Sequence, residues 1–411
     1  MVQVFPKLRP LDIRPYQQDG QQYLLLRDPL QITEHSLLIP QIMAPLLVLC
    51  DGTQDAVQLA ANFSQHLGLL VTTQLVEELI QRLDDGLMLD NVRYQAKRTK
   101  TLNTYRCQPF RKPALAGQSY PATANALWRF LQDYLEDANS IEPLAVDWSH
   151  PLGILSPHID YLRGGTTYAK IWKRMAHAAR EADLAIIFGT DHYGIDPFTL
   201  TQQNYATPYG TLPTARPIVD ALAESIGTEA AYAGELRHQG EHSLELVATW
   251  LHHMRAGDPC ELVPILCGGF HRFLSNGAQP NEDQEIQQVI KILRQMTAGR
   301  RVLVIASGDL AHVGPAFGGA PIIGRKRTQL RQTDDEMIAN MVAGDADGFF
   351  AAIRRINDQN NVCGVAPIYL TMQMVGAIAG EAVDYAACPA DDYDTSVVTI
   401  SGMVFHAQSK D

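Results

Sequence analysis

Short apolar runs recur through the larger, C-terminal part of the chain, and three of them end in the same kind of polar sequence. Residues 183–194 read DLAIIFGTDHYG, an Ile- and Leu-rich run that is too short for a core helix and leads into Asp191 and His192. Residues 153–155 and 302–306 lead in the same way into SPHID and SGDLAH. We interpret the three runs as buried strands, whose carboxyl ends form the edge where open α/β sheets bind ligands.

Between these strands, apolar residues recur at helical spacing. The pattern predicts helices over residues 123–134, 166–182, 241–254, 283–296, 334–342, 347–356 and 363–377, and further strands over 261–267 and 396–405. Alternating strands and helices are typical of a sheet covered on both faces. The predicted fold class for residues 109–411 is therefore α/β, with a mixed or mostly parallel sheet flanked by helices.

Residues 1–90 have a different pattern and are predicted to be a small α+β domain. Strands are expected at residues 22–26 and 37–39, helices at 41–50, 54–67 and 72–83, and a closing strand at 87–89. This order is winged-helix-like, and the segments LLLRDPLQI, LLVLCDGTQD and RLDDGLMLD resemble the PqqD-like peptide-binding domains. Residues 91–108 carry five basic residues and no acid, and we interpret them as a linker or as a strand lying over the second domain.

Charge and composition narrow the classes of partner. Five basic against eleven acidic residues give residues 1–90 a net charge of −6, which would repel nucleic-acid phosphates, so a peptide or protein partner is favoured there. The whole chain of 411 residues has a net charge of −12 and no run of 18 apolar residues, which argues against nucleic acid and membrane as partners. The first residues contain no apolar leader and the six cysteines show no CxxC spacing, so we expect a cytoplasmic protein with reduced thiols.

The candidate chemistry lies at the predicted sheet edge. The polar groups expected there are His158, Asp160, Asp191, His192, His242, Asp309, His312 and Cys363. Imidazoles, carboxylates and thiolates are the ligands that borderline divalent metals take, and two histidines with one anionic ligand would leave positions open for a substrate. The remaining acids and histidines would orient ligands or move protons.

Cys363 differs from the other cysteines because it stands at the start of a predicted helix. Free N–H groups at a helix start favour an anion, so the thiol pKa is expected to fall. A thiolate at this position would serve either as a metal ligand or as a nucleophile.

Six segments occur together and in order: ALAGQSYPA, SPHIDY, GTDHYG, EHSLE, SGDLAH and VCG. In this combination the chain resembles the MEMO family, in the bacterial form called AmmeMemoRadiSam system protein B. The resemblance implies a fold related to the non-haem iron extradiol dioxygenases and a metal pocket with His158, His192 and Cys363 as ligands. It also implies that Asp309, His312 and His242 are catalytic pocket residues, and that the metal is iron, with copper or zinc as alternatives.

The chain departs from the family pattern beside two of these histidines. Ile159 and Asp160 replace an Ala–Gly pair, Asp191 replaces a serine, and Tyr193 replaces a histidine. The two added carboxylates, Asp160 and Asp191, are expected to make the pocket more acidic and to join the catalytic set or the ligands. The thiolate ligand also differs from the carboxylate of the extradiol enzymes, so ring cleavage does not follow from the fold.

Three hypotheses therefore stand. The first is a redox metalloenzyme, an oxidoreductase acting on a small molecule or peptide. The second is a non-catalytic component of a modification system that binds a peptide or a radical-SAM partner through residues 1–90. The third is a metal-free hydrolase with Cys363 as nucleophile, assisted by Asp309 with His312 or His242.

Overall fold

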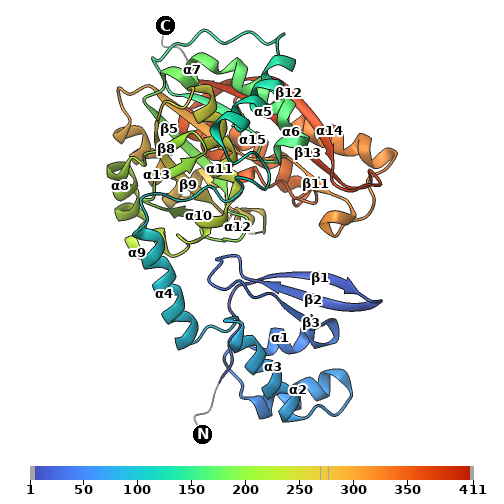
Figure 1. Cartoon of the computed structure of the whole chain (residues 1–411). Coiled ribbons are helices and arrows are strands. Elements are labelled where there is room, and N and C mark those ends of the chain that lie inside the picture. Colours follow the sequence, from blue (N-terminus) through green and yellow to red (C-terminus); the bar gives the residue numbers. More distant parts are fainter. Residues whose placement is uncertain (1–4, 269, 276, 408–411) are drawn as a thin grey trace. The chain divides into compact units, whose positions relative to one another are not determined.

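A computed structural model of the chain describes residues 5–268, 270–275 and 277–407 (Figure 1). The chain divides into two compact units, Met1–Cys107 and Gln108–Asp411, called here the N-terminal and the C-terminal unit. No helix in the described part of the chain combines the length and the apolar character needed to span a bilayer.

The N-terminal unit combines a small antiparallel sheet with helices, which fits a small α+β domain. Its strands pair in the order β1-β2-β3, with β1 at Asp12–Gln18, β2 at Gln21–Arg27 and β3 at Leu37–Pro40. The helices are α1 (Ala44–Leu49), α2 (Ala56–Leu67), α3 (Thr73–Asp85) and α4 (Val92–Arg106). One apolar cluster, built mainly from Leu26, Ile39, Leu59, Phe63, Val76 and Leu83, joins the sheet to the helices.

The structure differs from the predicted elements of this unit in three places. Strand β1 was not predicted, because six of its seven residues are exposed and the segment lacks an apolar alternation. Residues 87–89, expected as a strand, contribute only an isolated bridge between Leu89 and Leu8. Residues 91–108, expected as a linker or strand, contain α4, whose first turn is capped by Asn91.

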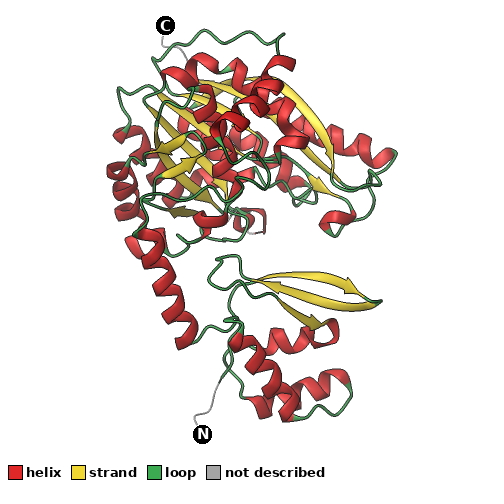
Figure 2. Cartoon of the chain, viewed as in Figure 1, coloured by secondary structure: helices red, strands yellow, loops and turns green. Residues whose placement is uncertain are grey.

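The C-terminal unit is built on one mixed, mostly parallel central sheet of eight strands (Figure 2). The order is β11-β13-β4-β10-β5-β9-β6, and β12 pairs with β13. Four parallel strands form its centre: β4 (Leu152–Ser156), β10 (Val302–Ser307), β5 (Leu184–Thr190) and β9 (Glu261–Cys267). The antiparallel strands are β6 (Phe198–Leu200), β11 (His312–Val313), β12 (Ala377–Pro389) and β13 (Val397–Ala407).

Helices cover both faces of this sheet, as the alternation of strands and helices predicts. One face packs against α5 (Ala124–Asp137), α6 (Tyr161–Arg174), α7 (Ala176–Glu181) and α11 (His242–Met254). The other packs against α8 (Arg216–Ile226), α13 (Gln284–Met296), α14 (Arg325–Val342), α15 (Ala346–Arg355) and α16 (Val365–Val375). Shorter elements are α9 (Thr228–Tyr232), α10 (Arg237–Gly240), α12 (His271–Ser275) and the hairpin of β7 (Tyr205–Thr207) with β8 (Gly210–Leu212). The predicted α/β class with flanking helices is confirmed.

A buried carboxyl group lies between α14 and β12. Asp334 of α14 is fully buried, and the Tyr385 hydroxyl of β12 donates a hydrogen bond to its Oδ2 at 2.8 Å. Burial raises the pKa of Asp334 from 3.8 to about 6, although the hydrogen bond from Tyr385 acts in the opposite direction. The folded state therefore binds a proton at Asp334 more tightly than the unfolded chain does.

We predict that Asp334→Asn stabilises the protein at pH 8 and has little effect near pH 4. Because the folded pKa of Asp334 lies above its unfolded value, the wild type gains stability as the pH falls from about 6 towards 3.8. At pH 8 the ionised carboxylate destabilises the fold by up to about 3 kcal/mol, and the substitution removes this cost. Urea unfolding of the C-terminal unit at both pH values measures the difference. Asp335→Asn, at an exposed ion pair with Arg331, is the control and should show less than about 1 kcal/mol at either pH. Equal effects of Asp334→Asn at both pH values would contradict the prediction.

Candidate metal centre

Three neighbouring strands bring the predicted site residues to one edge of the sheet. Strand β10 lies between β4 and β5, and all three are fully buried. His158 follows the carboxyl end of β4, His192 that of β5, and Asp309 that of β10. Cys363 comes from a different place, the turn immediately before α16. Parallel strands end at the same edge, so residues far apart in the sequence meet there.

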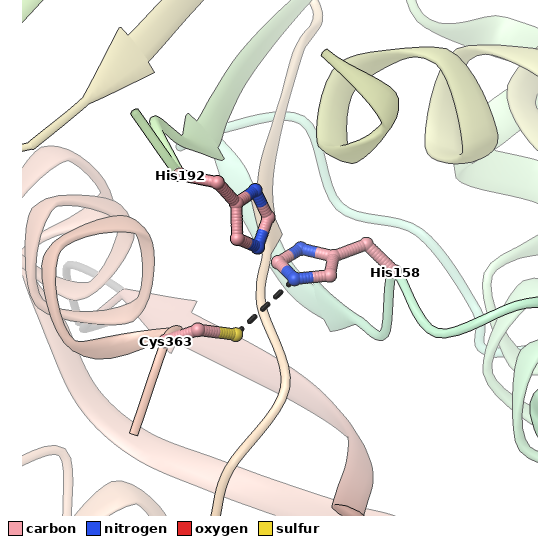
Figure 3. A group of neighbouring side chains, drawn as sticks. All are labelled: His158, His192 and Cys363. Atoms are coloured by element: carbon pink, nitrogen blue, oxygen red, sulfur yellow. Dashed lines mark hydrogen bonds between the residues drawn. The ribbon is translucent and has the colours of Figure 1, made fainter. Parts of the chain in front are cut away.

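The side chains of His158, His192 and Cys363 point toward one another (Figure 3). The Sγ atom of Cys363 lies 3.1 Å from Nε2 of His158, and one ligand atom from each of the three residues lies within 4.8 Å of the others. His158 is buried and Cys363 is half-buried, while His192 is the most accessible of the three. The group contains two imidazoles and one thiol, a donor set that iron, copper and zinc accept.

Two glycines allow the sulfur to reach the strand ends. A Cβ atom on Gly308 would lie 2.6 Å from Cα of Gly364, and one on Gly364 would lie 2.7 Å from the carbonyl oxygen of Asp309. Any larger residue at either position would push the two backbones apart. The contact is fixed by a hydrogen bond from the Gly364 N–H to the Asp309 carbonyl, at 2.9 Å. The Asp309 N–H points at the sulfur of Cys363, 3.4 Å away.

Asp309 holds the loop that carries the first histidine. Its Oδ1 accepts hydrogen bonds from the backbone N–H of His158 at 2.8 Å and of Ile159 at 3.3 Å. Its Oδ2 lies 3.9 Å from Nε2 of His158. Burial raises the pKa of Asp309, although His312 and these hydrogen bonds oppose the shift. Asp309 therefore combines a positioning role with a carboxyl oxygen inside the centre.

Glu241 is the functional residue that the sequence analysis missed. Its buried carboxylate lies 3.0 Å from Nδ1 of His192 and 3.2 Å from Nδ1 of His242, and it accepts the Ser243 N–H at 3.0 Å. Burial opposes the charge, but the two histidines hold the pKa of Glu241 well below its usual value. An ionised carboxylate only accepts, so Nδ1 of both rings carries a proton, and Nε2 is the ring nitrogen that can face other partners. An acid directly before a histidine at a helix start was the available signal.

The charge states of the first histidine and the cysteine follow from burial. Desolvation, together with the neighbouring His192 and His242, lowers the pKa of His158 well below 6.5, so this imidazole is neutral. Desolvation also raises the pKa of Cys363, although the hydrogen bond from His192 acts against it. The expected fall in the thiol pKa is therefore wrong for the metal-free protein, because burial outweighs the effect of the helix start.

His242 and His312 border the centre through different residues. The His242 ring stacks on His192 with centroids 4.6 Å apart, and its side chain is 38% exposed. His312 forms a second group of possible ligand atoms with Asp309 and Cys363, again within 4.8 Å. Desolvation lowers the pKa of His312, although the neighbouring Asp309 opposes the shift. Both rings therefore border the group formed by His158, His192 and Cys363.

The two additional carboxylates have other partners. Asp191 is buried and accepts a hydrogen bond from Nε of Arg237 at 2.7 Å. Asp160 caps α6, accepting from the Arg163 N–H at 3.1 Å and from Arg163 Nε at 2.6 Å. Neither residue belongs to the groups of ligand atoms found among the described residues. The structure thus places both acids in local ion pairs that shape the loops beside His158 and His192.

A second buried carboxylate on α11 ties the start of the C-terminal unit to this region. Glu245 pairs with Arg111 and accepts hydrogen bonds from the Leu115 N–H at 2.8 Å and the Tyr120 hydroxyl at 2.5 Å. Arg111 also donates to the carbonyl oxygen of Glu241 at 3.0 Å. The segment ALAGQSYPA is thereby attached to the helix that carries Glu241 and His242.

The sequence is similar to those of known proteins. A family model described as "Memo-like protein" matches residues 111–404. The chain is 25% identical to a MEMO1 family protein of Aquifex aeolicus over 405 residues, covering 98% of this chain and all of the relative. It is 27% identical to a MEMO1 family protein of Archaeoglobus fulgidus, over 72% of this chain and 99% of the relative. A MEMO1 family protein of Methanosarcina barkeri is 26% identical, over 67% of this chain and 92% of the relative.

We predict that Glu241→Gln lowers the pKa of His192. Burial disfavours the imidazolium, but the Glu241 carboxylate holds the pKa of His192 well above 6.5. Removing that charge leaves the desolvation uncompensated, so the ring should lose its proton at a lower pH than in the wild type. Imidazole ¹⁵N chemical shifts of the metal-free protein report both the pKa and which ring nitrogen carries the proton.

The matched control is Glu224→Gln, which removes an exposed carboxylate from α8. It should leave the titration of His192 unchanged. If Glu241→Gln also left that titration and the Nδ1 proton unchanged, Glu241 would not be the group that sets the state of the ring.

Proposed function

The chain belongs to the Memo-like protein family, and we propose that its C-terminal unit is a redox metalloprotein that holds iron or, alternatively, copper; zinc, a third possible ion, would bind without redox activity. The observation that carries this proposal is the approach of His158, His192 and Cys363 from three separate segments, with their ligand atoms within 4.8 Å. The resemblance of the sequence motifs to a family related to non-haem iron extradiol dioxygenases supports iron and an oxidoreductase activity on a small molecule or peptide.

The side chains fit such an ion. His158 is neutral, and Nδ1 of His192 is bound to Glu241, so a metal ion would have to displace only the proton on Nε2 of His192 to gain that ligand. The Asp309 N–H directed at Cys363 and the start of α16 next to it both favour a thiolate once a cation replaces the thiol proton. A redox metal at this position would supply Lewis acidity and one-electron chemistry.

The flanking residues have distinct roles in this proposal. His242 takes or delivers a proton at the accessible side, because its Nδ1 is fixed on Glu241 and its Nε2 is free. His312 and Asp309 form the acid–base pair at the opposite end of the cysteine. Asp191 and Asp160 act as positioning residues through Arg237 and Arg163.

We predict that Cys363→Ser abolishes tight metal binding. The wild type, stripped and reloaded under anaerobic conditions with Fe(II), or with Co(II) as a spectroscopic probe, should bind about one ion per chain. Cys363→Ser should weaken binding by at least about 100-fold, because a hydroxyl is a poor ligand for these ions, and should remove the Co(II)–thiolate absorption. Affinity should rise with pH, since the thiol must lose its proton.

Cys107→Ser, which changes an exposed cysteine outside the centre, is the control and should bind metal like the wild type. Less than about 0.1 ion per chain in the loaded wild type would refute the metal function. If the metal-free protein instead hydrolysed an ester with a rate that depended on Cys363, the nucleophile hypothesis would replace it.

A second function is favoured by the N-terminal unit. Here we propose residues 1–90 as a PqqD-like, winged-helix-like module that binds a peptide or a radical-SAM partner, with residues 91–108 connecting it to the metal domain at 109–411. Strand β1 is an edge of its sheet, so one row of backbone groups is open to an added strand, and Ile13 and Tyr16 are 40% and 44% exposed on it.

We predict that the full chain, tagged and purified from its native host, retains a radical-SAM protein identified by mass spectrometry. Replacing both Ile13 and Tyr16 by serine should reduce the retained partner about tenfold or more, since exposed aromatic and aliphatic side chains anchor such contacts. Leu70→Ser, at a site 93% exposed elsewhere in the unit, should have no effect. Retention unchanged by the double substitution would exclude this surface, and a partner-free chain that turns over substrate would exclude the function.

A further inference from the structure

A cavity of about 260 Å³ opens beside the proposed metal ligands. His192 and Cys363 form part of its wall, while His158, Asp309 and His312 do not line it. Apolar side chains make up much of the remaining lining: Phe270, Leu274, Val362, Val365 and Ala366. Since about 150 Å³ is enough to hold a benzene ring, the cavity has room for a ring with short substituents. It is therefore large enough for a small ligand that reaches the sulfur.

The charged side chains that line the cavity are mainly acidic. Its described lining contains neither lysine nor arginine, and it includes two carboxylates, Asp191 and Asp358. Arg237 neutralises Asp191, at 2.7 Å. Among the described residues no salt bridge joins a cation to Asp358; the basic side chains of the lining are the exposed His271, which acts on Asp358 from nearby, and His192, which pairs with Glu241. The cavity thus presents one carboxylate whose charge is largely uncompensated.

Asp358 is held rigidly in this position. It is 9% exposed, and its Oδ1 accepts the Val362 N–H at 2.9 Å, which leaves Oδ2 for another donor. Asn357, Asp358 and Asn361 have φ angles of 48°, 47° and 49°, so the turn before Cys363 is built from left-handed residues. Asparagine and aspartate adopt this conformation more readily than other residues with a side chain. The turn that delivers the cysteine therefore also fixes Asp358 in the cavity wall.

We propose that this cavity binds a small molecule with an apolar body about the size of one ring and a cationic, hydrogen-bond-donating group that pairs with Asp358, so that its other end reaches Cys363 and His192. An organic ammonium fits both features, and a carboxylate or phosphate of the same size is excluded by the uncompensated negative charge. Burial raises the pKa of Asp358, although the Val362 N–H and the nearby His271 oppose the shift. The claim that such a molecule is the substrate rests on the proposed metal function. The claim that the cavity binds it does not depend on a metal.

The test uses three probes of matched shape: benzylamine, benzyl alcohol and benzoate. Calorimetric titration of the metal-free full chain should show benzylamine binding at least about tenfold more tightly than benzyl alcohol, and no binding of benzoate, because a charge-assisted hydrogen bond is stronger than a neutral one. Asp358→Asn should lower the affinity for benzylamine about tenfold and leave benzyl alcohol unchanged. Asparagine keeps the oxygen that accepts from Val362 and tolerates a left-handed φ.

Two further variants test whether the probes bind inside this cavity. Ala366→Leu fills the cavity and should abolish binding of both benzylamine and benzyl alcohol, whereas Glu224→Gln removes a remote exposed carboxylate and should change neither. Benzoate binding as well as benzylamine, or benzylamine binding unaffected by Ala366→Leu, would overturn the proposal.

The Co(II)-loaded protein then separates the two claims. Benzylamine should shift the Co(II) absorption, since the cavity shares His192 and Cys363 with the centre, and the shift should be lost in Ala366→Leu. Ligand binding without any spectral shift would overturn the substrate claim. Failure of Co(II) to bind at all would instead refute the metal function, while the titrations of the metal-free protein would still decide whether the cavity selects ammonium ligands.

Discussion

The centre depends on one steric constraint, the contact between the backbones at Gly308 and Gly364. These glycines lie on separate segments, one after the end of β10 and the other before α16. A side chain on either glycine would clash with the backbone of the other segment. The contact sets the sulfur of Cys363 against the loop that carries Asp309, and Asp309 in turn holds the backbone of His158. The separation of sulfur and imidazole is thus determined by backbone packing, which is much stiffer than side-chain rotation.

Two buried carboxylates at the start of α11, Glu241 at its N-cap and Glu245 in its first turn, orient further parts of the centre. Glu241 orients His192 and His242, and Glu245, one turn later, binds the segment that opens the C-terminal unit. Arg111 lies between them, because it pairs with Glu245 and donates to the carbonyl of Glu241. Buried ion pairs of this kind add little net stability, since desolvation offsets much of the attraction. Their contribution here is to specify one arrangement of the helix start on which the histidines depend.

The sequence predicted the parts of the molecule that follow from local pattern. The three buried strands, the helices on both faces and the approach of His158 to His192 follow from apolar periodicity and from the rule that parallel strands end at one edge. The place of Cys363 beside them, before α16, was expected from the resemblance to the MEMO family. Strand β1 escaped prediction because it is exposed on both faces. The partners of Asp191 and the role of Glu241 depend on contacts over more than 40 residues of sequence, which no local pattern contains. The raised pKa of Cys363 has the same origin, because burial is a property of the whole fold.

The protonation states of the centre favour the arrival of a cation. Glu241 is ionised, while burial raises the pKa of both Asp309 and Cys363, so these two groups hold their protons more tightly than they would in water. Such upward shifts are the expected response of acidic groups that are removed from water. A divalent ion would supply a compensating positive charge and release the thiol proton at the same time. The raised pKa of Cys363 argues against a free nucleophilic thiolate and is compatible with the metal site proposed above.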